Sequence, residues 1–427
     1  MKYVIIGNGV SSIGAIEGIR KIDKQSEILV ISEEGFLTYG RPLISYFLAG
    51  KVGDERLALR SSDFYSKNNV QTMLGSKVIE ILPEEKKIVV KDKQEVSYDK
   101  LLIATGGTPF CPPIKGLEGD GIYFFTTLNH AKQLDAVCPK LKKVVVIGGG
   151  LIGLKAAESL FDRGVKVSIV ELAPRVLSSA FDEVAGKIVA NRLTSVGLSI
   201  FCGTTVKEIQ RDDAGKVKGV FLENGTYLEV DAVIVAIGVV PNIELAQKAG
   251  LEINRGILVD KFLTTSKDDI FAAGDVAEAW DKLINDNRVI PIWPNAYAQG
   301  YAAGQNMAGA KREYEGGLPM NSIGFYGLPT ISIGLVNPPE GKGFQIEMMV
   351  DEEREVYRKL VFKGDYLVGC VLVGDIDMAG RYAGYIRFQI PVKDLNLKNN
   401  LKQNKATYLD WPEEVFQQFW NKDARIR

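Results

Sequence analysis

Two glycine-rich segments have the composition and spacing of loops that bind the pyrophosphate of a dinucleotide. The first reads GNGVSS, and the residues expected to contact a ligand are Gly7, Gly9, Val10, Ser11 and Ser12. Glycines let the backbone approach a phosphate closely, and a helix that starts in such a loop adds N–H donors and a partial positive charge. The segment therefore predicts an anion-binding turn between a strand and a helix.

The neighbouring residues have the pattern of a complete βαβ unit around this loop. Residues 2–6 are a β-branched strand, residues 12–21 repeat apolar side chains at helical spacing, and residues 27–31 form a second strand. Glu33 and Glu34 follow that strand, where a carboxylate accepts hydrogen bonds from a ribose hydroxyl. A glycine motif alone is weak evidence for dinucleotide binding. The prediction depends on the strand, the helix and the acidic residue that accompany the motif at the expected spacing.

The same unit recurs in the middle of the chain. A strand at 143–147 leads into a second loop, GGGLIG, where the expected ligand contacts are Gly149, Gly150, Leu151, Ile152 and Gly153. A helix follows, and the strand at 165–170 ends at Glu171. Two complete units indicate two dinucleotides or the two halves of a duplication. The alternative for the second loop is that it merely packs its helix on its strand.

The residue counts exclude several other kinds of chemistry. The chain of 427 residues has one histidine, His130, and four cysteines far apart in sequence. Neither a multi-histidine metal site nor an iron–sulfur ligand run is therefore expected, and no metal is predicted. A net charge of −1 argues against nucleic acid and acidic membranes as partners. No apolar run reaches ~18 residues and the N-terminus lacks a secretion signal, so we expect a cytoplasmic protein without a membrane helix.

Three further strand-plus-glycine runs continue the α/β pattern. They end in Ala104-Thr105-Gly106, in Gly238 ahead of Pro241-Asn242, and in Gly274-Asp275. Each apolar run is short and aliphatic, as expected for a buried parallel strand. After about residue 313 the pattern changes to antiparallel strands, at 331–334, 355–362 and 366–373, with a Gly364-Asp365 turn between the last two.

The two glycine loops and these three runs are five motifs, and their order along the chain resembles that of the pyridine nucleotide-disulfide oxidoreductase superfamily over about residues 1–390. Members of this superfamily are flavoproteins with two dinucleotide sites. The resemblance implies an α/β fold with two Rossmann-like domains, for FAD and for NAD, and a C-terminal α+β domain. The implied boundaries are an FAD domain at 1–112 and 240–312, an NAD domain at 113–239, an interface-type α+β domain at 313–392 and a tail extension at 393–427. The implied cofactors are FAD and NADH.

The resemblance also implies roles for single residues. The FAD pyrophosphate would lie against Gly7, Gly9 and Ser12, its adenosine ribose against Glu33 or Glu34, its ribityl chain against Asp275 and its adenine against Val78. Trp293 opens a helix, through Ala296, whose N-terminus faces the flavin pyrimidine ring and favours the negative charge of reduced flavin. Trp293 packs either on the ring system or in the ordinary core. The remaining expected cofactor contacts are Ala104, Thr105, Gly106, Gly238 and Gly274.

The run Tyr39-Gly40-Arg41-Pro42 resembles the branch of rubredoxin, ferredoxin and nitrite reductase flavoproteins, and it places Arg41 and Pro42 at the cofactor. Disulfide reductases carry CxxxxC in this region. NADH peroxidases and coenzyme A-disulfide reductases carry a single cysteine, which aligns with Tyr39. Without a thiol, electrons cannot pass through a disulfide or a sulfenic acid, so they must leave directly from reduced flavin.

Two positions bear on the redox chemistry and on the choice of nucleotide. The resemblance places Lys155 at a position where relatives have a glutamate near the flavin and the nicotinamide. Lys155 is therefore either a cation near flavin N5, which would raise the reduction potential of the flavin, or a lysine on the surface of a helix. Glu171 would bond the ribose hydroxyls of NADH and repel a 2′-phosphate, which favours NADH over NADPH although Arg175 is nearby. His130 is expected to begin a surface helix with no catalytic role, because hydride transfer to flavin needs no protein acid or base.

We therefore expect an FAD-dependent NADH:acceptor oxidoreductase that takes a hydride from NADH and delivers single electrons to a small carrier, rubredoxin or an iron–sulfur protein. The alternatives are an NADH oxidase that reduces O2 and an electron-transfer subunit of a larger redox complex. The tail at 393–427 has aromatic residues. It either docks a partner or a second subunit, giving a homodimer or a larger complex, or is a solvated extension.

Overall fold

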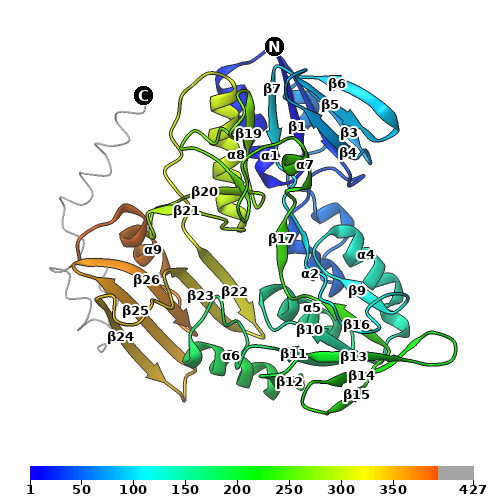
Figure 1. Cartoon of the computed structure of the whole chain (residues 1–427). Helices are drawn as coiled ribbons and strands as arrows, with labels where there is room; N and C mark the ends of the chain where they lie inside the picture. Colours follow the sequence, from blue (N-terminus) through cyan, green and yellow to red (C-terminus); the bar gives the residue numbers. More distant parts are fainter. Residues whose placement is uncertain (393–427) are drawn as a thin grey trace. The chain divides into compact units, whose positions relative to one another are not determined.

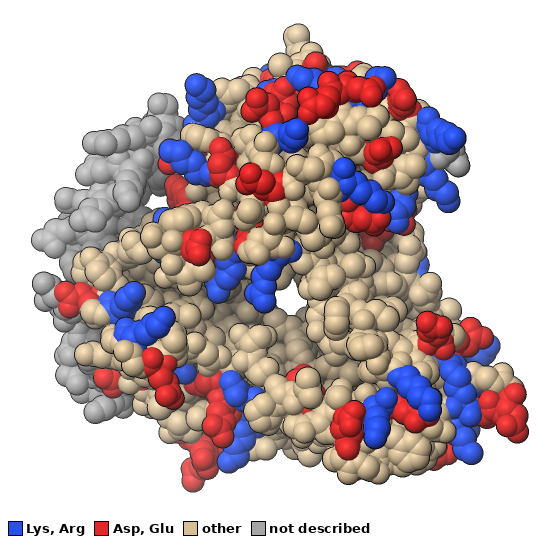
Figure 2. All heavy atoms as spheres, viewed as in Figure 1, with Lys and Arg blue, Asp and Glu red and all other residues tan. Residues whose placement is uncertain are grey.

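The computed structural model describes residues 1–392, apart from the side chain of Asp92. The described chain divides into two compact units. The first contains residues 1–179 and 186–319, and the second contains 180–185 together with the chain from 320 on (Figure 1). Lys, Arg, Asp and Glu are interspersed over the face drawn in Figure 2. This distribution agrees with the net charge of −1.

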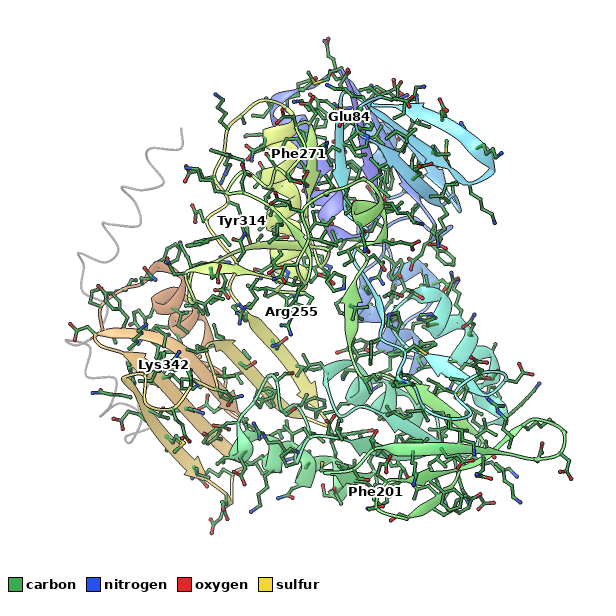
Figure 3. The ribbon with its side chains drawn as sticks, in the orientation of Figure 1. Glu84, Phe201, Arg255, Phe271, Tyr314 and Lys342 are labelled. Carbon is green, nitrogen blue, oxygen red and sulfur yellow. The ribbon has the colours of Figure 1, made fainter. Side chains whose placement is uncertain are left out.

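A five-stranded parallel sheet carries the first glycine loop. Its strand order is β19-β7-β1-β2-β3. The bounds are β1 (Lys2–Ile6), β2 (Glu27–Ser32), β3 (Val70–Leu74), β7 (Lys100–Ile103) and β19 (Ile270–Ala272). Residues 3–6 and 28–32 are buried, as expected for parallel strands covered on both faces. Phe271 of β19 is part of this core (Figure 3).

Helices α1 (Val10–Ile22) and α8 (Trp293–Met307) pack closely against each other and against this sheet. Glycines at 14, 18, 300 and 304 allow the close approach, because a Cβ at any of them would collide with the backbone of the other helix. Gly300 lies against Ser11, and Gly304 against Ala15. The two helices therefore run in the same direction, and the first turn of α8 extends past the N-terminus of α1.

A second five-stranded parallel sheet carries the second glycine loop. Its order is β12-β11-β10-β16-β9, and Phe201 of β12 is labelled in Figure 3. The bounds are β9 (Ile122–Phe124), β10 (Lys143–Ile147), β11 (Lys166–Glu171), β12 (Ser199–Cys202) and β16 (Ala232–Val235). The helices of this half are α4 (Leu128–Val137), α5 (Leu151–Asp162) and α6 (Glu183–Ser195).

Smaller elements complete the first unit. An antiparallel insertion before β7 has three strands, β4 (Val78–Leu82), β5 (Lys87–Val90) and β6 (Gln94–Ser97). A second antiparallel insertion, before β16, has the strands β13 (Val206–Arg211), β14 (Val217–Leu222) and β15 (Tyr227–Glu229). The pair β8 (Gly107–Pro109) and β17 (Val239–Pro241) connects the two halves. The remaining elements are η1 (Arg41–Leu43), α2 (Ile44–Leu48), η2 (Asp54–Arg56), α3 (Phe64–Lys67), η3 (Lys91–Lys93), η4 (Cys138–Lys140), α7 (Glu244–Lys248), β18 (Ile257–Leu258), β20 (Ala277–Asp281) and β21 (Asp286–Arg288).

In the described residues, the second unit consists of an antiparallel sheet, helix α9 (Ala379–Phe388) and the segment 180–185. The strand order is β22-β23-β26-β25-β24, and α9 packs against β26 and β23. The bounds are β22 (Met320–Phe325), β23 (Leu328–Gly334), β24 (Phe344–Asp351), β25 (Val356–Lys363) and β26 (Tyr366–Val373). The segment 180–185 is held in this unit by a hydrogen bond from Asn337 Nδ2 to Phe181 O, 3.2 Å long.

The expected fold class is confirmed, with two parallel sheets of dinucleotide-binding type and an antiparallel C-terminal sheet. The hairpin of β25 and β26 was predicted within one residue at each end. Strands β22 and β24, β5 and β6 of the first insertion and β13 to β15 of the second are among the described strands that were not predicted from the sequence. No helix among residues 1–392 is long and apolar enough to cross a membrane. The tail at 393–427, with the docking expected of it, lies outside the described residues.

Candidate dinucleotide-binding sites

The first glycine loop is held in a conformation that only glycine adopts easily. Gly7 has φ +107°, and a Cβ there would collide with the carbonyl of Ala104. Its N–H donates to Ile31 O over 2.7 Å, and the Ser12 hydroxyl donates to Gly7 O over 2.7 Å. Ser12 is fully buried, so its hydroxyl shapes the loop from behind.

The N-terminus of α1 is open toward this loop. Gly9 is the N-cap, no side chain caps the helix, and a Cβ at Gly9 would meet no atom within 4 Å. The N–H groups of Val10 and Ser11, the first two residues of the helix, have no partner inside the helix. The loop therefore fits an anionic group such as a pyrophosphate.

A polar network that sequence reasoning missed ties this loop to the segment that follows β2. The hydroxyl of Thr38 donates to Asn8 O over 2.6 Å, and that of Tyr65 donates to Asn8 Oδ1 over 2.7 Å. Asn8 Nδ2 in turn donates to Phe36 O over 3.2 Å. Asn8 is one of the variable positions of the motif and its partners are far away in sequence, so no local pattern identifies them.

The two glutamates after β2 have different surroundings. Glu33 is exposed and pairs only with Lys77, at 3.2 Å. Glu34 is partly buried; it accepts the hydroxyl of Tyr39 over 3.2 Å and lies 3.8 Å from Arg41 Nη2. Because an exposed ion pair is worth only ~0–1 kcal/mol, Glu33 is the carboxylate more readily available to a ribose.

Tyr39 and Arg41 connect the first half of the unit to the segment before α4. The Tyr39 hydroxyl accepts Leu128 N–H over 3.0 Å, and Arg41 Nη1 donates to Thr126 O over 2.8 Å. The Arg41 guanidinium lies over the Tyr39 ring, 5.6 Å from its centroid. Burial raises the pKa of Tyr39 to about 12, so its hydroxyl stays neutral. Pro42 follows in the short helix η1.

The single histidine lies beside this group, in the first turn of α4 as predicted. His130 Nδ1 is 3.2 Å from Thr126 Oγ1, and its backbone N–H bonds the N-cap hydroxyl of Thr127. Burial, helped by the Arg41 charge, lowers the pKa of His130 below its usual value. These contacts hold the imidazole against Thr126, and the absence of a catalytic role for His130 stays a prediction.

Residues from β19 and α8 converge on the first loop. Gly274 has φ +84° and donates its N–H to Gln299 Oε1 over 2.8 Å. A Cβ on Gly274 would lie 2.9 Å from Ser11 Oγ and 3.7 Å from Ala296 Cβ. Asp275 follows, and burial raises the pKa of its carboxyl although the Arg41 charge opposes this. No residue in the described part of the chain hydrogen-bonds to this carboxylate, which fits an acceptor for ligand hydroxyls.

Trp293 is at the exposed start of α8, so it is not an ordinary core tryptophan. Its side chain is 37% exposed, and its ring stacks on that of Tyr297 with centroids 6.4 Å apart. Tyr297 stacks in turn on Tyr301 at 6.2 Å. Packing of Trp293 on the flavin remains a prediction, and the indole face opposite Tyr297 is the one it would use.

The second glycine loop repeats the first with a fixed carboxylate beside it. Gly148 has φ +110°, and Gly150 is the N-cap of α5, where a Cβ would meet no atom within 4 Å. Leu151 and Ile152 form the first turn, and Gly153 leaves no room for a Cβ against Gly148 O. This loop also fits a pyrophosphate.

Glu171 lies at the edge of this second loop. Its two carboxylate oxygens accept the N–H groups of Gly149, over 2.5 Å, and Ala173, over 2.7 Å. Gly186, in α6, approaches the side chain of Arg175, since a Cβ on Gly186 would lie 3.3 Å from Arg175 Cδ. The two hydrogen bonds to its carboxylate hold Glu171 beside the loop, where the ribose of a nucleotide would follow the pyrophosphate.

The other predicted contacts link the two halves. The Thr105 hydroxyl donates to Asn242 O over 3.0 Å, and Asn242 Nδ2 donates to Thr105 O over 2.9 Å. Gly106 and Gly238 have φ of +64° and +112° and stand at the ends of the pair β8 and β17. These residues shape the crossover between the halves. Val78 is buried at the start of β4.

Lys155 belongs to α5, and its side chain contacts α2. Its ammonium pairs with Glu158 and lies over the Tyr46 ring, 5.8 Å from the centroid. The Lys155 side chain is 20% exposed, so it is not a freely solvated surface lysine. Because Glu158 compensates the charge, the effect of Lys155 on a nearby flavin would be smaller than that of a lone cation.

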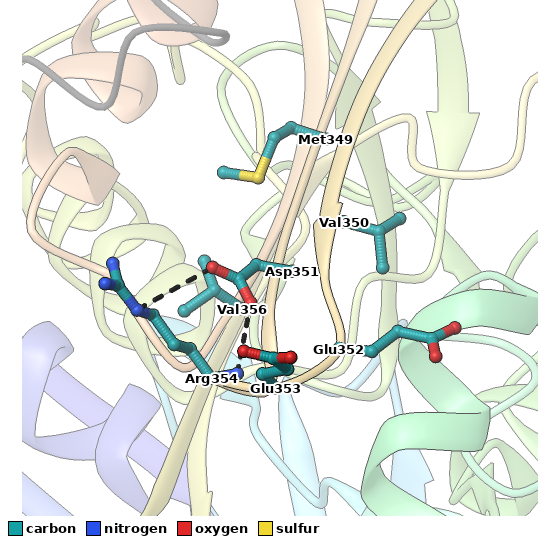
Figure 4. A pocket seen from close by; sticks show the side chains of 7 residues that line it. All are labelled: Met349, Val350, Asp351, Glu352, Glu353, Arg354 and Val356. Carbon is teal, nitrogen blue, oxygen red and sulfur yellow. Dashed lines mark hydrogen bonds and ion pairs between the residues drawn. The ribbon is translucent and has the colours of Figure 1, made fainter.

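A hollow at the tip of the second unit contains none of the predicted site residues. It has a volume of about 520 Å³ and lies at the turn between β24 and β25. Figure 4 shows its lining, in which Arg354 bonds Asp351 through its backbone N–H over 3.1 Å. Among the described residues, no group of three or more His, Cys, Asp or Glu could hold a metal ion.

Comparison with protein families adds two matches. Residues 1–300 match the model of the pyridine nucleotide-disulphide oxidoreductases, and residues 319–390 match that of the rubredoxin NAD+ reductase C-terminal domain.

Three curated relatives have similar identities but different lengths. Nitrite reductase [NAD(P)H] of Bacillus subtilis is 32% identical over 411 residues, which are 95% of this chain and 50% of that protein. The NADH-dependent phenylglyoxylate dehydrogenase subunit epsilon of Aromatoleum evansii is 31% identical over 98% of both chains. An NADH oxidase of Methanocaldococcus jannaschii is 32% identical over 89% of both. The chain thus spans about half the length of the nitrite reductase and nearly all of the subunit epsilon.

Solved structures agree with the observed fold. The putidaredoxin reductase–putidaredoxin complex matches with a TM-score of 0.85 at 26% identity, covering 95% of this chain and 99% of that one. A ferredoxin reductase from Rhodopseudomonas palustris matches with a TM-score of 0.86 at 26% identity, covering 95% and 100%.

Proposed function

Because the chain belongs to the pyridine nucleotide-disulphide oxidoreductase family, which implies FAD and NAD(P)H, we propose that it is an NADH-dependent reductase that passes single electrons to a small redox protein. When bound, FAD would supply the redox chemistry: it can accept one hydride, which carries two electrons, and release these electrons one at a time. The chain's own residues bind the two dinucleotides, orient them and fix the path by which electrons leave.

The first site supports FAD binding through an open helix N-terminus, a carboxylate in an exposed ion pair and a carboxylate without a hydrogen-bond donor among the described residues. The open N-terminus of α1 after Gly9 receives the pyrophosphate, and the exposed Glu33 receives the adenosine ribose. Asp275 accepts hydrogen bonds from the ribityl hydroxyls, which would stabilise its charge against the cost of burial. The α8 N-terminus, from Trp293 to Ala296, faces the flavin ring in this arrangement.

The second site supports NADH as the electron donor. Gly150 opens α5 to the pyrophosphate, and Glu171 is fixed beside the loop as an acceptor for two ribose hydroxyls. A 2′-phosphate in the same place would meet a carboxylate of like charge, a contact that costs several kcal/mol. NADH is therefore the expected substrate.

The absence of a thiol at Tyr39 is the observation that carries the proposal. The Tyr39 hydroxyl is neutral and engaged with Leu128 and Glu34. The four cysteines are free and lie elsewhere in the fold: Cys111 after β8, Cys138 after α4, Cys202 at the end of β12 and Cys370 in β26. With no thiol relay beside the flavin, electrons pass directly to an external acceptor.

The acceptor is proposed from the family match of residues 319–390 to the rubredoxin reductase C-terminal domain. A redox protein of the rubredoxin or iron–sulfur type is the expected partner. A second candidate is an electron-transfer subunit of a larger enzyme, favoured by the end-to-end match to a dehydrogenase subunit. Direct reduction of O2 is the third outcome to be tested.

Anaerobic stopped-flow measurement distinguishes these functions. NADH is mixed with the FAD-loaded protein, and rubredoxin, a [2Fe–2S] ferredoxin or O2 is added in separate second mixes. We expect fast bleaching of the flavin by NADH, rapid reoxidation by one of the carriers and slow reoxidation by O2. Rapid turnover with O2 alone would establish the oxidase. Slow reoxidation by all three would favour the subunit, and no bleaching by NADH would overturn the proposal.

A further inference from the structure

Helix α5 and its C-cap have polar side chains next to α2, and we propose that their contacts set the spacing between the nicotinamide and the flavin. These side chains are Lys155, Glu158, Ser159, Asp162 and Arg163, at intervals of three and four residues. They are positioning residues for hydride transfer. This inference rests on the proposed function.

Four of these side chains contact α2 or the residues just after it, and one of the four is Lys155, whose ammonium lies over the Tyr46 ring. Ser159 Oγ lies 2.9 Å from Ser45 O and 2.6 Å from Lys155 O, so its single proton is shared between these two carbonyls. Arg163 Nη1 donates to Leu48 O over 2.9 Å. Asp162 Oδ2 pairs with Lys51 Nζ at 2.6 Å. The contacts therefore follow α2 from its second residue to the turn beyond its end.

Helices α5 and α2 are each connected to a different one of the two proposed cofactor sites. Helix α5 begins at Gly150, in the second glycine loop, so a shift along its axis moves the proposed NADH site. Helix α2 continues directly from η1, which contains the Arg41 and Pro42 proposed to lie at the flavin (Figure 1). The contacts between α2 and α5 thus join the two sites through two short, stiff elements.

Polar contacts suit this role because hydrogen bonds are directional. An apolar interface tolerates small sliding movements, whereas a hydrogen bond weakens steeply when its angle or length changes. Ser159 is 2% exposed, and losing its contact would leave the carbonyl of Ser45 with the backbone N–H of Ala49, 2.9 Å away, as its donor. Lys51 is 53% exposed, and its ion pair with Asp162 contributes little.

Arg163 extends the same contact to a third helix. Its Nη1 also donates to Asp135 Oδ1 in α4 over 2.8 Å, so one guanidinium joins α2, α4 and the end of α5. The Asp135 carboxylate is the main cause of the raised pKa of Arg163. Ser159 and Arg163 are therefore the two residues whose loss should move the NADH site relative to the flavin.

The variants Ser159→Ala and Arg163→Met, tested as FAD-loaded protein, separate positioning from binding. Reacting atoms must approach to about 3–3.5 Å, and a misplacement of about 1 Å costs roughly a hundredfold in rate. We expect the limiting rate of flavin reduction to fall at least about tenfold, while the Kd for NADH stays within about twofold. The kinetic isotope effect with NADH deuterated at C4 should become more temperature-dependent, and Arg163→Lys should recover part of the rate.

Two matched controls keep the result interpretable. Ser195→Ala removes a helix hydroxyl that bonds only within α6, and Arg211→Met removes a guanidinium that bonds carbonyls inside the NAD half. Both should keep wild-type reduction rates even if thermal stability falls. Wild-type rates and isotope effects in Ser159→Ala and Arg163→Met would overturn the positioning role alone. A wild-type protein that NADH does not reduce would instead overturn the proposed function.

Discussion

The Glu171 carboxylate accepts the backbone N–H of Gly149 over 2.5 Å, which ties the end of β11 to the second glycine loop. The other carboxylate oxygen accepts Ala173 N–H over 2.7 Å. The acid is thus oriented before any nucleotide arrives. Binding at this position therefore needs little further ordering of the side chain, which favours affinity.

Replacing Glu171 by glutamine should weaken NADH binding with little effect on the chemical step. Hydrogen bonds to a charged group are worth ~1.5–3 kcal/mol, so KM for NADH should rise about tenfold or more while kcat stays close to wild type. The preference for NADH over NADPH should shrink, because the like-charge contact is gone. Steady-state kinetics with both nucleotides measures this. Glu229→Gln, which removes an acid from a surface ion pair, is the control. An unchanged KM and preference would show that Glu171 does not contact the ribose.

Lys155 and Glu158 should shift the flavin potential in opposite directions. If this pair lies near flavin N5, Lys155→Met removes a cation that favours reduced flavin and lowers the midpoint potential. Glu158→Gln leaves that cation uncompensated and raises it. A shift of about 30 mV in a two-electron couple corresponds to ~1.4 kcal/mol, and we expect changes of that order. Dye-coupled anaerobic titration measures the potential.

The two variants are expected to shift the midpoint potential in opposite directions, whereas a general loss of structure would not produce shifts of opposite sign. Lys143→Met, which breaks an exposed ion pair on β10, should leave the potential unchanged. If Lys155→Glu also leaves it unchanged, Lys155 is not close enough to the flavin to act on it.

The parts of the site that follow from local sequence were predictable. Gly7, Gly148 and Glu171 belong to strand–loop–helix patterns whose geometry is set within about thirty residues. The start of α8 at Trp293 also follows from sequence, because Pro294 is favoured in a first helical turn.

The parts that depend on contacts between distant segments were not predictable. Asn8 meets Thr38 and Tyr65 only after the sheet has formed, and Tyr39 meets Leu128 across the two halves. Ser12 was expected to lie against the pyrophosphate, but residue type does not determine whether a serine hydroxyl faces a ligand or a carbonyl of its own loop. The structure directs the Ser12 hydroxyl to Gly7 O.

Asp275→Asn should stabilise the apoprotein and weaken FAD binding. Burial raises the pKa of Asp275, so its contribution to stability is complete below the ordinary aspartate pKa of about 3.9 and is lost as pH rises through the folded value. The stability advantage of the asparagine variant should therefore be absent at low pH and grow as pH rises. FAD affinity should fall about tenfold or more, because a charge-assisted hydrogen bond is lost.

Urea unfolding of the apoprotein across pH, together with flavin fluorescence titration, measures both effects. Asp213→Asn, at an exposed loop position, is the control and should show neither. A variant with wild-type FAD affinity would remove Asp275 from the cofactor site. An apoprotein advantage that fails to grow with pH would contradict the burial argument.

Lys359 in β25 should be essential to the stability of the second unit. The side chains of Lys359, Tyr357 and Asp182 are all buried, with Lys359 Nζ 2.9 Å and the Tyr357 hydroxyl 2.5 Å from the same oxygen, Asp182 Oδ2. Burial and the neighbouring carboxylate raise the pKa of Tyr357, so its hydroxyl remains a donor. Lys359→Met leaves a buried carboxylate without its cation and should cost about 3 kcal/mol of unfolding free energy. Tyr357→Phe keeps the ion pair and should cost about 1 kcal/mol.

Hydrogen exchange of the β25 amides and urea unfolding of the full chain distinguish these two losses. Lys363→Met, at an exposed position of the same strand, removes an equal charge and should change the unfolding free energy by less than about 0.5 kcal/mol. The double variant Lys359→Met with Asp182→Asn should recover part of the loss, because no unpaired charge remains buried. If Lys359→Met were no more destabilising than Lys363→Met, the hydrogen bonds from the Tyr357 hydroxyl and the Ala185 N–H would be sufficient to satisfy the carboxylate of Asp182.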